Sequence, residues 1–193
     1  VLKFKFFNFF GIQNWAYNCK NKKIANLPPS IPKRKIYQWC PPKISVKKNY
    51  VWKGLREGST AIGKGKLIND RIENFENLLV SKPKFNSNLH WGSRLAIKDN
   101  HIYASLGERG MGMIAQDPTK HPGSIIRINI DGSIPKNNPS NQNKSYWLPE
   151  IFQIGLRNPQ GMTISPFDEN IYFSQHGPKG GDNIGIVKFA GNY

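Results

Sequence analysis

From about Ser59 to the end of the chain, apolar and polar residues alternate in short runs, which is the pattern of half-buried β-strands. Turn residues such as Asp99-Asn100, Asp131-Gly132 and Gly180-Gly181 separate the runs. The run RIENFENLLV also fits a short helix, and we favour the strand; no helix longer than two turns is expected after Ser59. The predicted strands are Ser59–Leu67, Arg71–Val80, Ser93–Lys98, His101–Leu106, Ser124–Ile130, Gly161–Ser165, Asn170–Gln175 and Asn183–Val187.

Two stretches of the chain repeat one pattern. Gly92 to Gly110 reads GSRLAIKDNHIYASLGERG, and Gly161 to Gly181 reads GMTISPFDENIYFSQHGPKGG. Each is a strand, a polar turn, a second strand containing Ile-Tyr-x-Ser, and a glycine-rich exit. Repeated antiparallel hairpins of this kind are typical of β-propeller blades, and a β-sandwich is the alternative.

Residues 1–57 lack both strand alternation and a helical stripe, and the segment LPPSIP excludes a regular element there. We therefore predict two parts: an irregular basic segment over 1–57 and a folded part over 58–193. The Lys, Asn, Phe and Ile bias of the first part is also that of a disordered segment or of an AT-rich gene translated out of frame. The chain begins with Val1, so a fragment is expected.

The charge is concentrated at the beginning of the chain. The net charge is +16, but residues 1–66 carry 15 Lys and Arg and a single acid, Glu57. The rest of the chain is nearly balanced, so a solvated basic coil is favoured over a nucleic-acid-binding surface. No stretch approaches the roughly 20 apolar residues that span a bilayer, so no membrane span is predicted.

Polar residues with useful chemistry follow the predicted strands rather than lie within them, which is where sites usually form. His90 suits proton transfer near neutral pH, although a lone histidine is more often structural. Glu108, in a Gly-x-x-Gly turn, suits orienting a histidine or pairing with an arginine, and its alternative is a solvent-facing turn residue. Arg157, followed by Asn158 and Gln160, suits a ligand rich in carboxylate and carbonyl oxygens, with a structural ion pair as the alternative.

The loop that begins at His176-Gly177-Pro178 is tight and rich in backbone groups. Such loops offer carbonyl oxygens to calcium, and a plain turn between strands is the alternative.

Together these pieces resemble the glucose/sorbosone dehydrogenases, a family that includes soluble glucose dehydrogenases and aldose sugar dehydrogenases dependent on pyrroloquinoline quinone (PQQ). The resemblance covers about residues 58–193. It implies an all-β fold, a six-bladed β-propeller of four-stranded blades, of which this chain supplies two or three. The matching text is His90-Trp-Gly-Ser-Arg-Leu, Leu106-Gly-Glu-Arg-Gly, Arg127-Ile-Asn-Ile-Asp-Gly-Ser-Ile-Pro, Arg157-Asn-Pro-Gln-Gly and His176-Gly-Pro-Lys-Gly-Gly-Asp.

The resemblance also implies roles for individual residues, with PQQ and calcium as cofactors. His90 resembles the general base, Glu108 the acid that supports it, and Arg157 the cation that stabilises negative charge on the quinone. The remaining positions resemble binding residues. The residues that resemble cofactor contacts are Arg157, Asn158, Gln160 and His176. The carbonyls of Gly177 and Pro178 resemble calcium ligands, and Asp182 resembles a sugar-binding residue.

The expected function is oxidation of aldose sugars to lactones, with electrons passed to an external acceptor. A non-catalytic propeller that binds a protein partner is the alternative, and a nucleic-acid binder is a third hypothesis. The resemblance implies a periplasmic or secreted location. Two departures from the family are Leu156, where a histidine is usual, and Asn183, where a glutamate is usual.

Overall fold

The computed structural model describes residues 17–18, 23–24, 44–48, 57–68 and 71–193. Strands make up nearly all regular structure in these residues, and the only helical segments among them are three short 3-10 turns, so the predicted all-β class is confirmed. The turns are η1 (Gly112–Gln116), η2 (Pro139–Asn141) and η3 (Pro178–Gly180). In the described residues no helix has the length and apolar character to cross a membrane.

A five-stranded sheet forms the centre of the molecule, in the order β13-β9-β8-β7-β6. Its strands β6 to β9 run antiparallel in chain order, as in one propeller blade, and β13 pairs parallel with β9. The bounds are β6 (Gly92–Lys98), β7 (His101–Leu106), β8 (Ile125–Asn129), β9 (Ile151–Ile154) and β13 (Gly191–Asn192).

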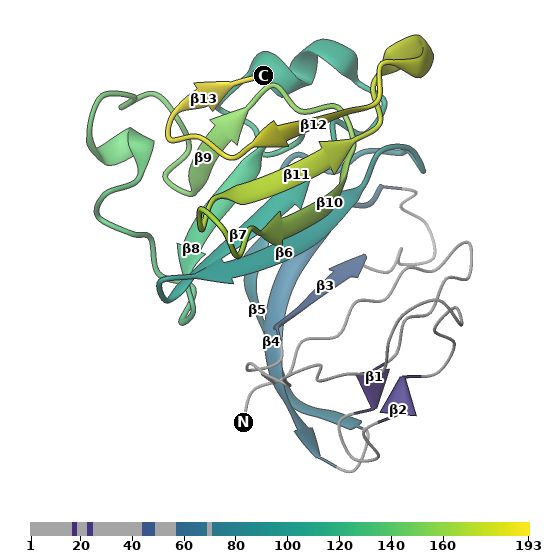
Figure 1. The fold of residues 1–193 in the computed structure, drawn as a ribbon, viewed down its shortest axis with the longest axis vertical. Coiled ribbons are helices and arrows are strands. Elements are labelled where there is room, and N and C mark those ends of the chain that lie inside the picture. Colours follow the sequence, from purple (N-terminus) through teal and green to yellow (C-terminus); the bar gives the residue numbers. More distant parts are fainter. Residues whose placement is uncertain (1–16, 19–22, 25–43, 49–56, 69–70) are drawn as a thin grey trace.

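Two three-stranded sheets lie on either side of this blade (Figure 1), and both are antiparallel. One contains β10 (Pro159–Ile164), β11 (Ile171–Gln175) and β12 (Asn183–Ile186). The other contains β3 (Ile44–Lys48), β4 (Thr60–Ile68) and β5 (Arg71–Val80). A further two-residue pair joins β1 (Tyr17–Asn18) and β2 (Lys23–Ile24).

Both faces of the central sheet are buried, which explains why the three sheets stack. One face packs Ile102, Ile126 and Ile128 with Ile62 of β4. The opposite face packs Tyr103, Ile125 and Phe152 with Ile171 and Phe173 of β11, and Tyr103 meets Phe152 edge to face with 5.3 Å between ring centroids. Alternate residues of β7 and β8 thus face opposite sheets, as the period of two requires.

All eight predicted strands are present, within two residues at each end. The sequence analysis missed β9 because its residues IFQI are buried on both faces and show no alternation. Strand β13 was also not predicted. Within the segment predicted to be irregular, β3 pairs with β4, with Ile44 opposite Lys64. The three larger described sheets have five, three and three strands, where four-stranded blades were expected.

Candidate active site

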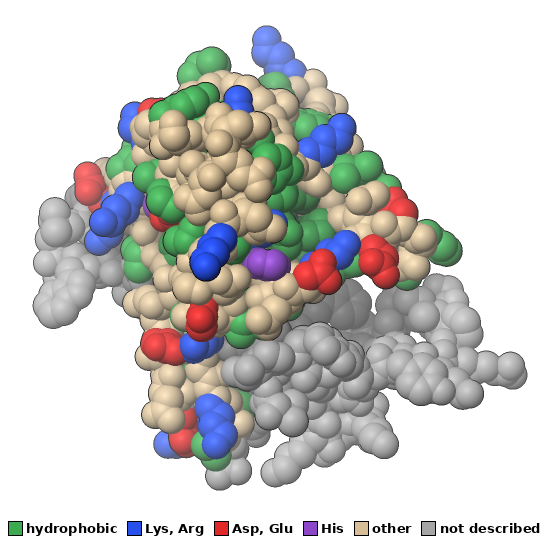
Figure 2. Space-filling view, turned by 90° about the vertical axis from the view of Figure 1, so that its left-hand side faces the viewer, with side chains coloured by type: hydrophobic (Ala, Val, Ile, Leu, Met, Phe, Trp, Pro, Cys, Tyr) green, Lys and Arg blue, Asp and Glu red, His purple; other side chains and the backbone are tan. Residues whose placement is uncertain are grey.

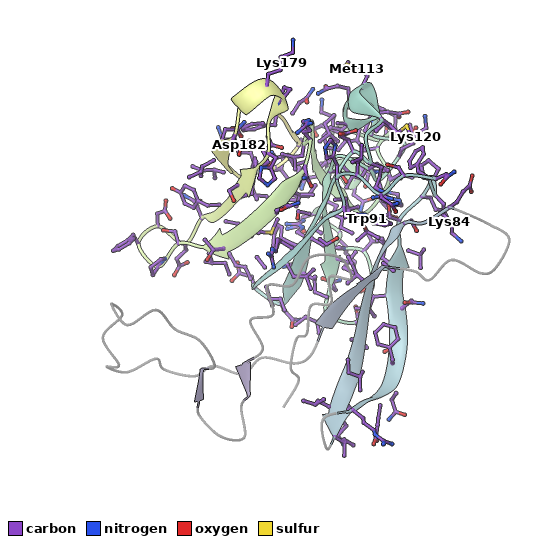
Figure 3. All side chains as sticks on the ribbon, turned by 90° about the vertical axis from the view of Figure 1, so that its right-hand side faces the viewer. Lys84, Trp91, Met113, Lys120, Lys179 and Asp182 are labelled. Atoms are coloured by element: carbon purple, nitrogen blue, oxygen red, sulfur yellow. The ribbon has the colours of Figure 1, made fainter. Side chains whose placement is uncertain are left out.

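The predicted site residues gather at one end of the central sheet and of the β10–β12 sheet. His90 precedes β6, Glu108 follows β7, Arg157 precedes β10 and His176 follows β11. Two hydrogen bonds join the loops of the two sheets: Glu108 N donates to Arg157 O at 2.9 Å, and Gly92 N donates to Asn158 Oδ1 at 3.3 Å. Figure 3 shows Met113 of η1 and Lys179 of η3 projecting from this same end.

His90 and Glu108 form a direct pair. Nδ1 of His90 contacts Oε1 of Glu108, and Oε2 of the same carboxylate accepts a hydrogen bond from Gly112 N at 2.6 Å. Only 3% of Glu108 is exposed. A buried carboxylate opposite Nδ1 keeps a proton on that atom, so Nε2, which has no partner among the described residues, is left to accept one. This is the geometry of an oriented general base.

The turn after β7 packs closely against the backbone of His90. A Cβ on Gly107 would lie 2.1 Å from His90 O, so only glycine allows the two segments to approach this closely. His90 itself has φ of +43°, in the left-handed region that non-glycine residues seldom adopt. His90 is therefore held in an unfavourable backbone conformation by its surroundings.

Arg157 is anchored at both its backbone and its side chain. Its N–H donates to Gln175 Oε1 at 2.9 Å, and Nη1 donates to the carbonyls of His176 and Gly177, each at 3.1 Å. Nε and Nη2 donate to none of the described residues. They remain as charged donors for an anionic or carbonyl-rich ligand.

Asn158 is buried, and its contacts are with neighbouring loops of the protein. Its side-chain oxygen accepts the hydrogen bond from Gly92 N, and its carbonyl accepts one from His176 N at 3.2 Å. It ties the two sheets together beneath the site.

His176 and Asp182 contact each other in the loop that contains η3. Nδ1 of His176 lies 3.0 Å from Oδ2 of Asp182, whose Oδ1 accepts a hydrogen bond from Gly177 N at 3.1 Å. Both side chains are more than half exposed. Beside them an open hollow of about 250 Å³ is lined by Gln160, Ser174, Gln175, His176, Asp182, Asn183 and Ile184. Gln160, His176 and Asp182 thus share one surface.

The carbonyls expected to bind calcium are engaged elsewhere. Gly177 O accepts from the Arg157 guanidinium, and Pro178 O accepts from Gly181 N at 3.0 Å. Calcium takes six to eight oxygen ligands, and a guanidinium on one of them adds a repelling positive charge. No cluster of three metal-ligating side chains exists within the described part of the chain. In this arrangement each of the two carbonyls already accepts a hydrogen bond, so calcium at Gly177 or Pro178 would require these contacts to change.

Sequence reasoning missed two residues that build the site. Gln175, buried in β11, holds the backbone of Arg157. Arg109, also buried, contacts the loop that carries His90. The sequence carries one signal for Arg109, its position in the Gly-Glu-Arg-Gly turn beside Glu108, but a turn position alone does not distinguish a buried arginine from an exposed one.

Stacked antiparallel sheets with polar residues collected at one end define part of a β-propeller. Residues 47–193 match the family model "Glucose / Sorbosone dehydrogenase". The chain belongs to this family, as the sequence predicted. The match begins within β3, before the boundary expected at residue 58.

Two curated relatives are named as sugar dehydrogenases. The chain is 34% identical over 140 residues to aldose sugar dehydrogenase YliI of Escherichia coli (strain K12), covering 71% of this chain and 38% of that protein. It is 32% identical over 144 residues to quinoprotein glucose dehydrogenase B of Acinetobacter calcoaceticus, covering 64% of this chain and 29% of that protein.

Solved structures agree on the fold. The apo-form of soluble aldose sugar dehydrogenase from Escherichia coli superposes with a TM-score of 0.71 at 29% identity, covering 79% of this chain and 48% of that one. The PQQ-bound aldose sugar dehydrogenase from Streptomyces coelicolor has a TM-score of 0.58 at 20% identity, covering 79% of this chain and 46% of that one, which shows the fold alone. The chain therefore spans about half the length of these structures.

Proposed function

We propose that this chain contributes the general base and the cationic group of a site that oxidises aldose sugars to lactones. The observation that carries the proposal is the His90–Glu108 pair beside Arg157, joined to it through the Glu108 N to Arg157 O hydrogen bond. A protein that only binds a partner has no need of an oriented base next to a cation. Membership of a family of PQQ-type sugar dehydrogenases supports the substrate class.

The chain's own residues divide the work. Nε2 of His90 takes the proton of the sugar hydroxyl, and Glu108 stabilises the imidazolium that forms. Arg157, with two donating nitrogens still open, binds a carboxylate- and carbonyl-rich cofactor and stabilises negative charge there. This donor set fits PQQ, which supplies the hydride acceptor when bound and passes the electrons to an external acceptor.

Three finer points belong to the proposal. Gln160, His176 and Asp182 line the hollow and are the residues we assign to cofactor and sugar binding. Calcium at Gly177 requires Arg157 to leave that carbonyl, so a calcium titration with and without PQQ tests it. A periplasmic or secreted location rests on family membership and is tested by cell fractionation.

The test is titration of the full-length protein with PQQ and calcium, followed by the cofactor spectrum and by dye reduction with added aldoses. We expect saturable binding and sugar-dependent reduction. His90→Ala should lower turnover by about 100-fold or more while sparing PQQ binding. His101→Ala, at the opposite end of β7, is the matched control and should leave turnover unchanged.

A folded protein that binds no PQQ would contradict the proposal and favour the non-catalytic propeller. The nucleic-acid hypothesis has a separate test, a strongly salt-dependent affinity for DNA. On the face drawn in Figure 2, the described basic and acidic side chains are interspersed rather than gathered in one basic patch.

A further inference from the structure

The segment that carries His90 has only two hydrogen bonds of its own among the described contacts, from Leu89 N to Ser87 Oγ and from Trp91 Nε1 to Asn88 O. Residues 86–91 form no helix or strand, and Leu89, next to the base, is 57% exposed. The left-handed φ of His90 adds a conformational cost. Some other part of the molecule must therefore hold this loop in the conformation that presents the imidazole.

Arg109 makes contact with four positions of this loop. Nη1 donates to Leu89 O at 2.5 Å, Nη2 donates to Ser87 O, and the Arg109 backbone N donates to His90 O at 3.3 Å. Its Cζ lies 3.1 Å from the centre of the Trp91 ring. A single side chain thus holds the loop on both sides of the base.

Burial makes this an unusual place for an arginine. Only 3% of Arg109 is exposed, and none of the described residues accepts a hydrogen bond from its Nε. Burial lowers the pKa of Arg109 to about 10, although the charge of Glu108 partly opposes that effect. The guanidinium is still charged near neutral pH, so the contacts to the two carbonyls are charge-assisted. Burying a cation is unfavourable unless it is compensated by its contacts, so the contacts of Arg109 with the 87–91 loop are expected to matter.

We propose that Arg109 is a positioning residue for His90: its guanidinium holds the backbone of residues 87–91 so that the imidazole meets the reacting hydroxyl. The role rests on the proposed function, in which His90 is the base. Glu108 orients the ring, and the next residue, Arg109, places the backbone. Trp91, whose ring lies against the guanidinium, completes the arrangement.

The diagnostic change is Arg109→Lys, because lysine keeps the charge but has no planar fork to reach two carbonyls and stack on a ring. The chain offers a matched control in Arg127, another buried arginine. Arg127 donates to Asn137 and Asn138 and lies 4.7 Å from the Phe152 ring, away from His90. Arg127→Lys therefore reports the general effect of losing such a fork.

Two measurements on the full-length protein test the proposal. The ¹⁵N and ¹H imidazole resonances of His90, recorded without cofactor, report the ring's tautomer and order. The kcat for aldose oxidation with PQQ reports its placement. Arg109→Lys should broaden or shift the His90 resonances and lower kcat by about 10- to 100-fold, as a displacement of roughly 1 Å does, and Arg127→Lys should change neither.

The outcomes separate the two proposals. Wild-type protein that oxidises no sugar refutes the function, while the His90 resonances still decide the positioning role. Unchanged His90 resonances in Arg109→Lys, or equal changes in Arg127→Lys, overturn the positioning role. If Arg109→Lys does not fold, Trp91→Phe replaces it, since a smaller ring weakens the stack; unchanged resonances there overturn the role as well.

Discussion

Replacing the Glu108 carboxylate by an amide, Glu108→Gln, is the sharpest test of the oriented base. In the native protein the two carboxylate oxygens accept from two donors, His90 Nδ1 and Gly112 N. Glutamine has a single oxygen and an NH₂ group in the same positions. The glutamine amide can therefore bond to both neighbours only if His90 Nδ1 loses its proton and accepts a hydrogen bond from the NH₂ group.

The size of the effect follows from the two orientations of that amide. With the oxygen toward His90, the imidazole keeps its useful tautomer, but the NH₂ group faces the Gly112 N–H and leaves it unpaired, at a cost of about 1–3 kcal/mol. With the oxygen toward Gly112, both bonds form, but the proton of His90 moves to Nε2 and the base is lost. The second orientation is favoured, and the active fraction falls by about 5- to 150-fold.

The assay is kcat for aldose oxidation at saturating PQQ, together with the ¹⁵N resonances of His90. We expect kcat to fall within that range, and the proton to appear on Nε2. Glu150→Gln is the matched control, because Glu150 Oε1 lies 2.7 Å from Nε2 of His121 in a second, partly buried carboxylate–histidine pair that does not include His90. A kcat for Glu108→Gln within twofold of the wild type, or an unchanged His90 tautomer, would refute the orienting role.

Two further predictions concern close packing and pH. Gly107→Ala should lower kcat by about 100-fold, because the new Cβ would displace the backbone of His90. Gly132→Ala, at the other end of the central sheet, should lower the stability but leave kcat unchanged. Both variants are checked by steady-state kinetics and by urea unfolding. Burial raises the pKa of Glu150, but the hydrogen bond from His121 and its neighbours outweigh burial and hold the pKa below its usual value. The stability that the Glu150–His121 contact contributes is therefore fully present above the ordinary carboxyl pKa, and it is lost as the pH falls through the lower pKa of the folded state. Urea unfolding between about pH 3 and 7 should show this loss of stability, and the loss should be smaller in Glu150→Gln.

The fold was largely predictable because turn residues separate most of the strands. The turn at Asp99-Asn100, for example, lies directly before β7, and the turn at Asp131-Gly132 follows β8. Strand β9 escaped because burial on both faces removes the alternation. Strand β13 has two residues, too few to carry a period.

The site was predictable only in part. The resemblance identified His90, Glu108 and Arg157, and the structure brings them together. It did not reveal that Arg157 occupies the Gly177 carbonyl, because that contact joins loops distant in the chain. For the same reason the sequence does not reveal the burial of Arg109, because that burial depends on the 87–91 loop that folds over it.

The turn Gly107-Glu108-Arg109-Gly110 now has a physical requirement at each position. Gly107 must lack a Cβ to let the turn lie against His90, and Glu108 must be a carboxylate to serve two donors. Arg109 and Gly110 both have positive φ, and a Cβ on Gly110 would lie 3.1 Å from Leu89. Because the imidazole and its backbone are held by neighbouring residues of one turn, a shift of that turn moves the base as a unit. Substitutions anywhere in the turn should therefore be detectable first at His90, before they are detectable in the stability of the blade.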